Sequence, residues 1–283
     1  MKVLVFGKTG QVAMELQRHA DVIALDRSQA DLSDPEACAK IVEQTDADVV
    51  INAAAYTAVD GAETDEDAAR LINADAPAAM ARAAAARGLP FLHISTDYVF
   101  DGSGTRAKSV KDATAPINAY GRTKLLGEQG VVMAGGRHAI LRTSWVFSAH
   151  GANFVKTMLR LGKERDALSI VNDQIGGPTA AADIAATLVT MATAMHRGNA
   201  HSGVYQYSGA PDVSWEDFAR EIFAQAGIDV DVSGIPSSAY PTPAKRPLNS
   251  RLDCRCTENM FVIPRPVWRI GLANVLRELG ETR

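Results

Sequence analysis

KVLVFGKTGQVA, residues 2–13, joins a short apolar run to two glycines and a small residue. The run at residues 2–6 is rich in Val and Leu, which predicts a buried strand, and the following residues open a helix. Gly7 and Gly10 allow a tight turn in which the backbone approaches a pyrophosphate, while the small Ala13 lets helix and strand pack closely. Alone this spacing is a weak signal, but its place between a strand and a helix predicts a dinucleotide site.

The rest of the first half repeats the pattern of strand and helix. Short runs rich in Val, Ile and Leu, bounded by turn residues, predict strands at residues 22–26, 48–54, 91–95 and 139–143. Helical composition lies between them, including an Ala-rich segment at 78–87 and a capping box formed by Ser33 and Glu36. This alternation predicts an α/β fold: a Rossmann-type doubly wound parallel sheet with right-handed crossovers.

The second half is less regular, and it predicts a smaller C-terminal substrate-binding lobe. A strand at 169–171 and a helix at 180–195 are followed by closely spaced prolines between residues 236 and 266, which indicate loops around a ligand. We expect an NAD(P)-binding domain at 1–148 and the lobe at 149–283. Segments at about 165–200 and 242–258 are expected to return to the first domain.

Composition excludes several other classes of protein. The net charge is −4, from 29 basic and 33 acidic residues, whereas nucleic-acid-binding proteins usually carry a basic excess. No apolar run reaches the roughly 18 to 20 residues that cross a bilayer, and residues 1–10 suit a strand better than a signal peptide. Three sparse cysteines fit a reducing, cytoplasmic location, and neither they nor the scattered histidines have the spacing of metal ligands.

Charged side chains after the second strand bear on the choice of dinucleotide. Asp26 follows Gly7 by about 20 residues, where a carboxylate accepts hydrogen bonds from the adenosine ribose. The adjacent Arg27 suits a 2′-phosphate, so the choice between NADH and NADPH stays open. Asp31 and Leu32 follow where adenine is expected, and small residues at 52–55 are suited to line the cofactor channel.

A tyrosine and a lysine stand four residues apart, at Tyr120 and Lys124. On a helix this spacing places both on one face. A nearby ammonium and an oxidised nicotinamide are expected to lower the pKa of the phenol from about 10, which would aid proton exchange. Ser95, Thr96 and Asp97 follow the fourth strand, at the sheet edge where ligands bind in α/β proteins. The glycine turn, the hydroxyl group and the YxxxK pair occur in the order of a short-chain dehydrogenase.

At these residues the chain resembles the dTDP-4-dehydrorhamnose reductase family, within the extended short-chain dehydrogenases/reductases. The resemblance covers nearly the whole chain, and together its motifs are highly specific. They are FGKTGQ (6–11), NAAAYTAVD (52–60), STDYVFDG (95–102), APINAYGRTK (115–124), RTSWVF (142–147), NFVKTMLRLGKER (153–165), VNDQIGGPT (171–179) and YPTPAKRPLNSRLD (240–253).

The resemblance implies a role for each matching residue. Tyr120 would donate a proton to the C4 oxygen of the sugar, Lys124 would support it and bond the nicotinamide ribose, and Thr96 would assist at the same oxygen. The residues implied at the cofactor are Gly7, Gly10, Gln11, Val12, Asp26, Arg27, Asp31, Leu32, Ala55, Tyr56, Thr57, Tyr120 and Lys124. Those implied at the dTDP-sugar are Thr96, Asp97, Trp145, Lys245 and Arg246.

Three positions depart from the family pattern, and other properties stay open. Ala13 replaces a glycine, Tyr56 replaces a histidine, which puts its side-chain contact in doubt, and Lys245 stands where arginine is frequent. The family is described as using Mg²⁺, for which Glu15 is a candidate ligand, although a glutamate on a helix surface needs no metal. The metal ligands and the oligomeric state, for which a homodimer is one candidate, are not determined by the sequence.

Two other functions compete with a rhamnose-type reductase. One is another nucleotide-sugar reductase, epimerase or dehydratase of the same superfamily. A dehydratase would need a Glu or a further Asp beside the threonine, whereas Thr96-Asp97-Tyr98 supplies only one acid. The other is a regulatory subunit that binds NADP without turnover, which the intact Tyr120 and Lys124 disfavour.

Overall fold

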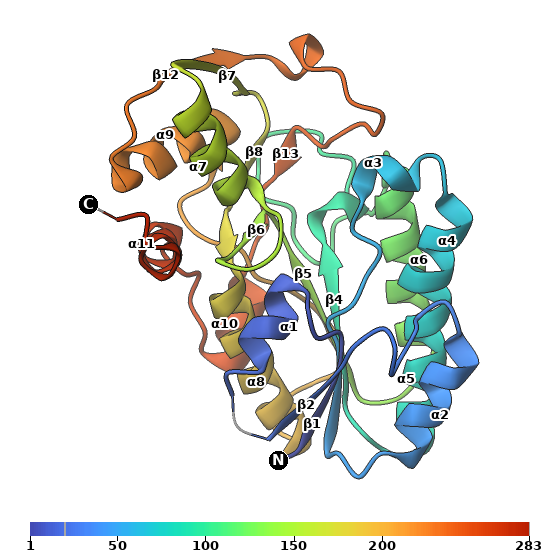
Figure 1. Ribbon diagram of the computed structural model, residues 1–283. Helices are drawn as coiled ribbons and strands as arrows, with labels where there is room; N and C mark the ends of the chain where they lie inside the picture. Colours follow the sequence, from blue (N-terminus) through green and yellow to red (C-terminus); the bar gives the residue numbers. More distant parts are fainter. Residues whose placement is uncertain (20, 283) are drawn as a thin grey trace.

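The structure is a computed structural model that describes residues 1–19 and 21–282. Its centre is a parallel six-stranded sheet in the order β2-β1-β3-β4-β5-β10 (Figure 1). The strands are β1 (Val3–Phe6), β2 (Val22–Leu25), β3 (Val49–Asn52), β4 (Phe91–Thr96), β5 (His138–Thr143) and β10 (Gly203–Gln206). The strand order reverses between β1 and β3, which is where open α/β sheets bind ligands. The predicted fold class is confirmed.

Helices cover both faces of the sheet, as doubly wound folds require. On one face lie α1 (Gln11–Leu16), α8 (Ala181–His196) and α10 (Arg255–Phe261), packed on an apolar core with Val5 and Leu141. The other face carries α2 (Pro35–Gln44), α5 (Ala76–Ala86) and α6 (Ala119–Met133), over a core that includes Phe6 and Met80. The short helices α3 (Val59–Ala62) and α4 (Glu66–Arg70), then a π-helical turn at Leu71–Asp75, lead into α5.

A smaller group of elements stands beside the carboxyl ends of the sheet and has its own core. Its helices are α7 (Phe154–Glu164), α9 (Trp215–Ala226) and α11 (Trp268–Leu279). Its strand pairs are β7 (Ala167–Val171) with β12 (Asp231–Ile235), and β6 (Val146–Phe147) with β9 (Thr179–Ala180); β8 (Ile175–Gly176) lies between β11 (Val213–Ser214) and β13 (Asn249–Ser250). The chain crosses between the two groups more than once, because α8 packs on the large sheet and β10 is one of its strands.

One local prediction is wrong. Asp34 rather than Ser33 is the N-cap of α2, since its carboxylate accepts from the Ala37 amide at 3.0 Å. Pro35 then occupies the first helical position, which tolerates a residue without an amide hydrogen. Ser33 instead donates its own amide to Asp31, in the turn before the helix.

No helix among the described residues combines the length and apolarity needed to span a bilayer.

Candidate active site

A cavity of about 1030 Å³ lies at the carboxyl ends of the strands, between the large sheet and the smaller group. Most of the residues predicted for the site line it. They are Gly7, Gly10, Gln11, Val12, Asp26, Arg27, Asp31, Leu32, Ala55, Thr57, Thr96, Asp97, Tyr120, Lys124, Trp145 and Arg246. Tyr56 and Lys245 are absent from this lining.

The glycine turn between β1 and α1 forms the floor of the cavity. Gly7 has a φ of +106°, and a Cβ there would lie 3.3 Å from the backbone of Ala53 and Ala54. Gly10 opens onto free space, and as the N-cap of α1 it brings no capping side chain. A diphosphate therefore has room to approach the backbone amides at the start of α1. These residues fit a dinucleotide.

Asp26, the carboxylate after β2, already has a hydrogen-bond donor and a cation beside it. Asp26 Oδ1 accepts from the Ser28 hydroxyl at 2.6 Å, and Asp26 Oδ2 lies 3.7 Å from Lys8 Nζ. Arg27 forms an exposed ion pair with Asp31 at 3.2 Å. Lys8 thus lies beside Asp26, while Arg27 pairs with Asp31 at the same end of the cavity. Lys8 was missed by the sequence analysis, because nothing in the sequence shows that its side chain turns toward β2.

The segment after β3 lines the cavity with Ala53, Ala54 and Ala55, whereas Tyr56 lies outside the lining. The Tyr56 amide donates to Asn73 Oδ1 at 2.8 Å, and Asn73 Nδ2 donates to the Tyr56 carbonyl at 3.1 Å. Its ring packs against Ala62 and Ala119. Both backbone groups of Tyr56 are therefore bonded within the protein, although its carbonyl oxygen can accept a second hydrogen bond.

Tyr120 lies on the first turn of α6, beside the end of β4. Asn118 caps this helix by accepting from the Gly121 amide at 2.8 Å. Gly121 is required because a Cβ there would lie 2.2 Å from the Tyr98 carbonyl oxygen. This close approach sets Tyr120 edge-on to the Tyr98 ring, with the ring centroids 5.8 Å apart.

The phenol of Tyr120 is buried in this structure. Burial, and then the charge of Asp97, raise its pKa above the ordinary value. No hydrogen bond joins Tyr120 to Lys124 among the described residues, and the lowering expected from the ammonium and an oxidised nicotinamide stays a prediction. The tyrosine is held as a neutral phenol, which is the form that a proton donor needs.

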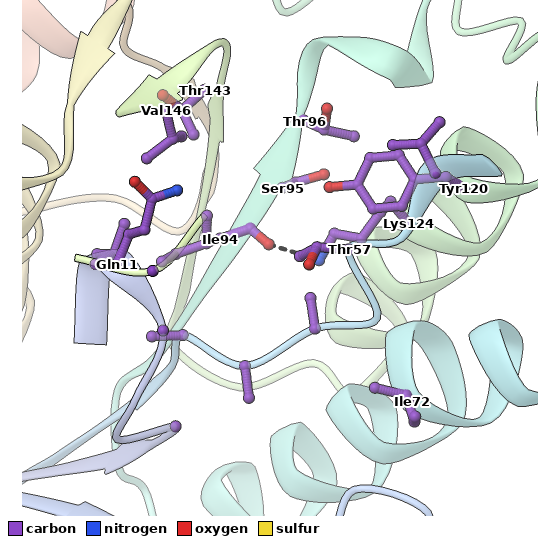
Figure 2. A pocket seen from close by; sticks show the side chains of 18 of the residues that line it. Gln11, Thr57, Ile72, Ile94, Ser95, Thr96, Tyr120, Lys124, Thr143 and Val146 are labelled. Carbon is purple, nitrogen blue, oxygen red and sulfur yellow. Dashed lines mark hydrogen bonds between the residues drawn. The ribbon is translucent and has the colours of Figure 1, made fainter. Parts of the chain in front are cut away.

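Lys124 is buried on the same side of α6. Its Nζ donates to the Ile94 carbonyl at 2.7 Å, as Figure 2 shows, and lies 3.2 Å from His93 Nε2. Burial lowers its pKa to about 8, against a smaller opposing effect of Glu128. Figure 2 also shows Tyr120, Lys124 and Thr96 around one side of the cavity.

Thr96 and Asp97 form one unit at the end of β4. The Thr96 hydroxyl donates to Asp97 Oδ1 at 3.0 Å and accepts from the Tyr98 amide at 3.2 Å. Asp97 Oδ2 is buried without a partner among the described residues. Burial raises the pKa of Asp97 to about 6. Asp97 lines the cavity with Ser250 close to its carboxylate, so an acceptor with spare capacity lies buried at the cavity wall.

An aromatic wall faces these polar groups. The Trp145 ring stacks on Trp215, with centroids 3.6 Å apart, and Phe154 packs on Trp215 at 4.6 Å. Gly176 leaves room for the Trp145 indole, since a Cβ there would lie 2.9 Å from its Cε2 atom. Trp145 has an unusual φ of +48° and is only partly buried, so it is a cavity residue rather than a core tryptophan.

Trp215 and Phe154 were missed by the sequence analysis. Trp215 is the first residue of α9, and Ser214 before it forms a capping box with Asp217. That sequence signal identifies a helix start, but not which other segment of the chain the helix start approaches.

Arg246 and Lys245 lie differently, although they are adjacent. Arg246 pairs bidentately with Asp60, at 3.0 and 2.8 Å, and also donates to the Ala244 carbonyl. Three of its five N–H donors are used, which leaves two for a ligand in the cavity. Lys245 is exposed, and its carbonyl accepts from Asn118.

Glu15 does not fit the magnesium site that the resemblance implies, and it is not a surface residue. Its side chain is buried on α1, with Oε1 3.1 Å from His150 Nε2 and Oε2 3.3 Å from Arg18 Nε. Cationic and hydrogen-bonding groups therefore already hold this carboxylate. Across residues 1–19 and 21–282, no group of three acidic, His or Cys side chains is arranged to hold a metal ion.

Comparison with known proteins gives a consistent result. The family described as "RmlD substrate binding domain" matches residues 1–281. The chain is 46% identical to dTDP-4-dehydrorhamnose reductase from Burkholderia thailandensis, over 99% of both chains, and 42% identical to that of Escherichia coli K12, over 100% and 99%. It is also similar to the crystal structure of dTDP-4-dehydrorhamnose reductase from Bacillus anthracis in complex with NADP. The TM-score is 0.91 at 35% identity, over 98% of this chain and 100% of that one.

Proposed function

The chain belongs to the dTDP-4-dehydrorhamnose reductase family, and we propose that it reduces dTDP-4-dehydro-6-deoxy-L-mannose at C4 to dTDP-L-rhamnose. The observation that carries the proposal is the position of Tyr120. Its phenol is held neutral at a cavity whose one end fits a dinucleotide and whose opposite wall is aromatic.

We assign the chemical roles as follows. A reduced nicotinamide dinucleotide, when bound, supplies the hydride for C4. Tyr120 gives its proton to the C4 oxygen, and Thr96 hydrogen-bonds the same oxygen. The neutral phenol suits this direction of reaction, because tyrosinate has no proton to give. Lys124 holds the proton that restores the phenol after each turnover, and its Nζ orients the ribose next to the nicotinamide.

The substrate half of the cavity is assigned to the other predicted residues. Asp97 offers its unpartnered Oδ2 to a sugar hydroxyl, Trp145 packs on the deoxysugar, and Arg246 directs its two remaining donors toward the diphosphate. Lys245 contributes at most long-range attraction, since it lies outside the cavity lining.

Both NADPH and NADH are proposed as cofactors. Asp26 repels a 2′-phosphate and accepts from a 2′-hydroxyl, whereas Lys8 and Arg27 attract the phosphate. Replacing Asp26 by Ala should raise the ratio of kcat/KM for NADPH over that for NADH, and replacing Arg27 by Ala should lower it. Initial rates with each cofactor measure both ratios, and unchanged ratios would place these side chains away from the ribose.

The organisation of the chain follows the same division. We propose that residues 1–148 bind the cofactor and that 149–283 mainly bind the substrate, with parts of 165–200 and 242–258 returning to the first domain. A homodimer in the cytoplasm is proposed as the working form. The three free cysteines agree with a reducing compartment, and mass photometry of the purified protein tests the dimer.

The proposed activity is tested by NADPH oxidation at 340 nm when the 4-keto-6-deoxy-L-mannose nucleotide is added. Absorbance should fall in proportion to substrate, and the Tyr120→Phe variant supplies the blank for non-enzymatic loss. Turnover of other 4-keto nucleotide sugars but not of this one would favour a different reductase of the superfamily. NADP binding without turnover of any of them would favour a regulatory subunit.

A further inference from the structure

Behind Lys124, away from the cavity, three buried side chains form a continuous hydrogen-bonded row. Asn52 at the end of β3 and His93 on β4 are register partners in the sheet, and both are fully buried. Asn52 Nδ2 lies 3.2 Å from His93 Nδ1, and His93 Nε2 lies 3.2 Å from Lys124 Nζ. The row therefore connects the loop after β3 to the amine beside Tyr120.

The backbone fixes the direction of this row. Asn52 Oδ1 accepts from the Ala54 amide at 3.1 Å, so the oxygen of the side-chain amide faces Ala54 and its nitrogen faces the histidine. An amide nitrogen only donates, and His93 Nδ1 must therefore accept. A neutral imidazole that accepts at Nδ1 carries its proton on Nε2. His93 thus presents an N–H group, and not a lone pair, to Lys124.

This direction has a consequence for the lysine. An ammonium has three hydrogens and no lone pair, so it would meet the His93 Nε2–H group with donor against donor. A neutral amine fits both contacts, because it donates one hydrogen to the Ile94 carbonyl and accepts from His93 with its lone pair. We propose that His93, oriented by Asn52, is a positioning residue that weakens the hold of Lys124 on its third proton and so makes Lys124 a ready proton source for Tyr120.

Burial already lowers the pKa of Lys124, and the other charges near the lysine do not lower it further. Glu128, one turn further along α6, favours the ammonium, but its carboxylate is occupied by Arg142 at 2.8 and 2.6 Å and by the Ser95 hydroxyl at 2.6 Å. Tyr120 is neutral, and Asp97 is bonded to Thr96. Burial, with the charge of Lys124, keeps the pKa of His93 well below its ordinary value, so the ring is the neutral one that the geometry requires.

The role in turnover rests on the proposed function. After the phenolic proton leaves Tyr120, the ammonium of Lys124 supplies the proton that restores the phenol, and the neutral amine then regains a proton from solvent. A donor whose pKa is near 8 gives up its proton more readily at neutral pH than a free lysine, whose pKa is about 10.4. The reaction needs the protonated lysine, so kcat/KM should fall as pH rises through about 8.

The test begins with the wild-type protein and needs no turnover. ¹⁵N-labelled histidine, read by two-bond ¹⁵N–¹H NMR, reports which ring nitrogen of His93 carries the proton. The Nε2–H form is expected, and the Nδ1–H form would overturn the proposal. Because this measurement does not depend on a substrate, it stands even if the proposed reductase activity fails.

The second part uses His93→Gln, with His196→Gln as the control at an exposed position on α8. Glutamine can turn its oxygen toward Lys124 and accept from the ammonium, so the lysine should keep its proton to higher pH. We expect the basic limb of the kcat/KM profile, and the titration of Lys124 followed by ¹³Cε NMR, to move up by about one pH unit or more.

The control His196→Gln should leave the basic limb of the kcat/KM profile and the titration of Lys124 unchanged. A purely structural role for His93 would lower the melting temperature or the rate but would leave the limb and the lysine titration where they were. Absence of turnover in the wild type, with the lysine titration still shifted by His93→Gln, would refute the proposed function and retain the link between His93 and Lys124.

Discussion

Tyr120 is enclosed at one end of the cavity, where burial and the charge of Asp97 raise the pKa of its phenol. Replacing it by Phe keeps the ring and its edge contact with Tyr98 but removes the proton. We predict a fall in kcat of about 10²- to 10⁴-fold, the usual contribution of a positioned acid. Steady-state kinetics with NADPH titration measures this, and near-normal turnover would exclude Tyr120 as the donor.

Asp97 gives a prediction about stability, because removing its buried charge should stabilise the fold. Its pKa is raised to about 6 from 3.8, so the folded state binds the proton more tightly than the unfolded chain, and stability falls as pH rises through this range. At pH 8 the buried carboxylate costs about 3 kcal/mol, from 1.36 kcal/mol per pKa unit.

Asp97→Asn should therefore be more stable than the wild type at pH 8 by up to this amount and nearly equal to it at pH 4, while it loses activity. Urea unfolding at the two pH values measures the difference. Asp101→Asn is the control, because the pKa of that half-buried carboxylate is lowered to about 2 and its replacement should give no gain in stability. An equal gain for Asp97→Asn at both pH values would contradict the account.

At single positions the sequence could predict residues whose role depends on local spacing. Tyr120 and Lys124 lie on one helix, and Gly7 and Gly10 lie in one turn, so the pattern contains the geometry. Trp215, Lys8 and His93 come close to the site through tertiary packing, for which a single sequence holds no signal. Burial raises the pKa of Tyr120, an effect that spacing could not predict because it does not show how deeply a side chain is buried.

Helix α6 and strand β5 are joined by a buried ion pair between Glu128 and Arg142, whose side chains are 4% and 5% exposed. Removing one partner leaves a buried charge without its counter-ion, which typically costs 3–5 kcal/mol. We predict a loss of about this size for Glu128→Ala in urea unfolding. The double replacement by leucine at both positions should cost much less. Similar losses for both variants would mean that the pair acts through packing alone.

At the level of elements, β1 to β5 and β7 were predicted within about two residues at each end, because each is a short apolar run bounded by turn residues, whereas β10 and β12 were missed. The cap of α2 was misplaced by one residue, since Ser33 and Asp34 are both good caps and the choice depends on the turn at Asp31. The two-residue strands β6, β8, β9, β11 and β13 were also missed. Two-residue pairings such as β8 with β13 depend on distant chain segments and have no periodicity of their own.

At the scale of the whole molecule, Arg246 joins the loop before β13 to α3 by its ion pair with Asp60, and it also lines the cavity. Replacing Arg246 by Ala should remove a charge-assisted contact with the substrate diphosphate, worth roughly 1.5–3 kcal/mol. That corresponds to a rise in KM for the dTDP-sugar of about 10- to 150-fold, if the contact is equal in the ground and transition states.

The adjacent Lys245→Ala is the matched control, because its side chain is exposed and outside the cavity lining. It should change KM little, and neither variant should alter NADPH affinity. Equal losses for substrate and cofactor in Arg246→Ala would indicate general damage to the loop. No loss for either ligand would leave Arg246 with only its structural bond to Asp60.

Transfer of deuterium from cofactor to sugar tests whether the enzyme reduces C4 of the dTDP-sugar. The enzyme is incubated with the 4-keto-6-deoxy-L-mannose nucleotide and NADPH deuterated at the transferable C4 position, and the product is examined by NMR and mass spectrometry. We expect dTDP-L-rhamnose with one deuterium at C4 of the sugar. A product with the opposite configuration at C4, with deuterium at another carbon, or with none would contradict it.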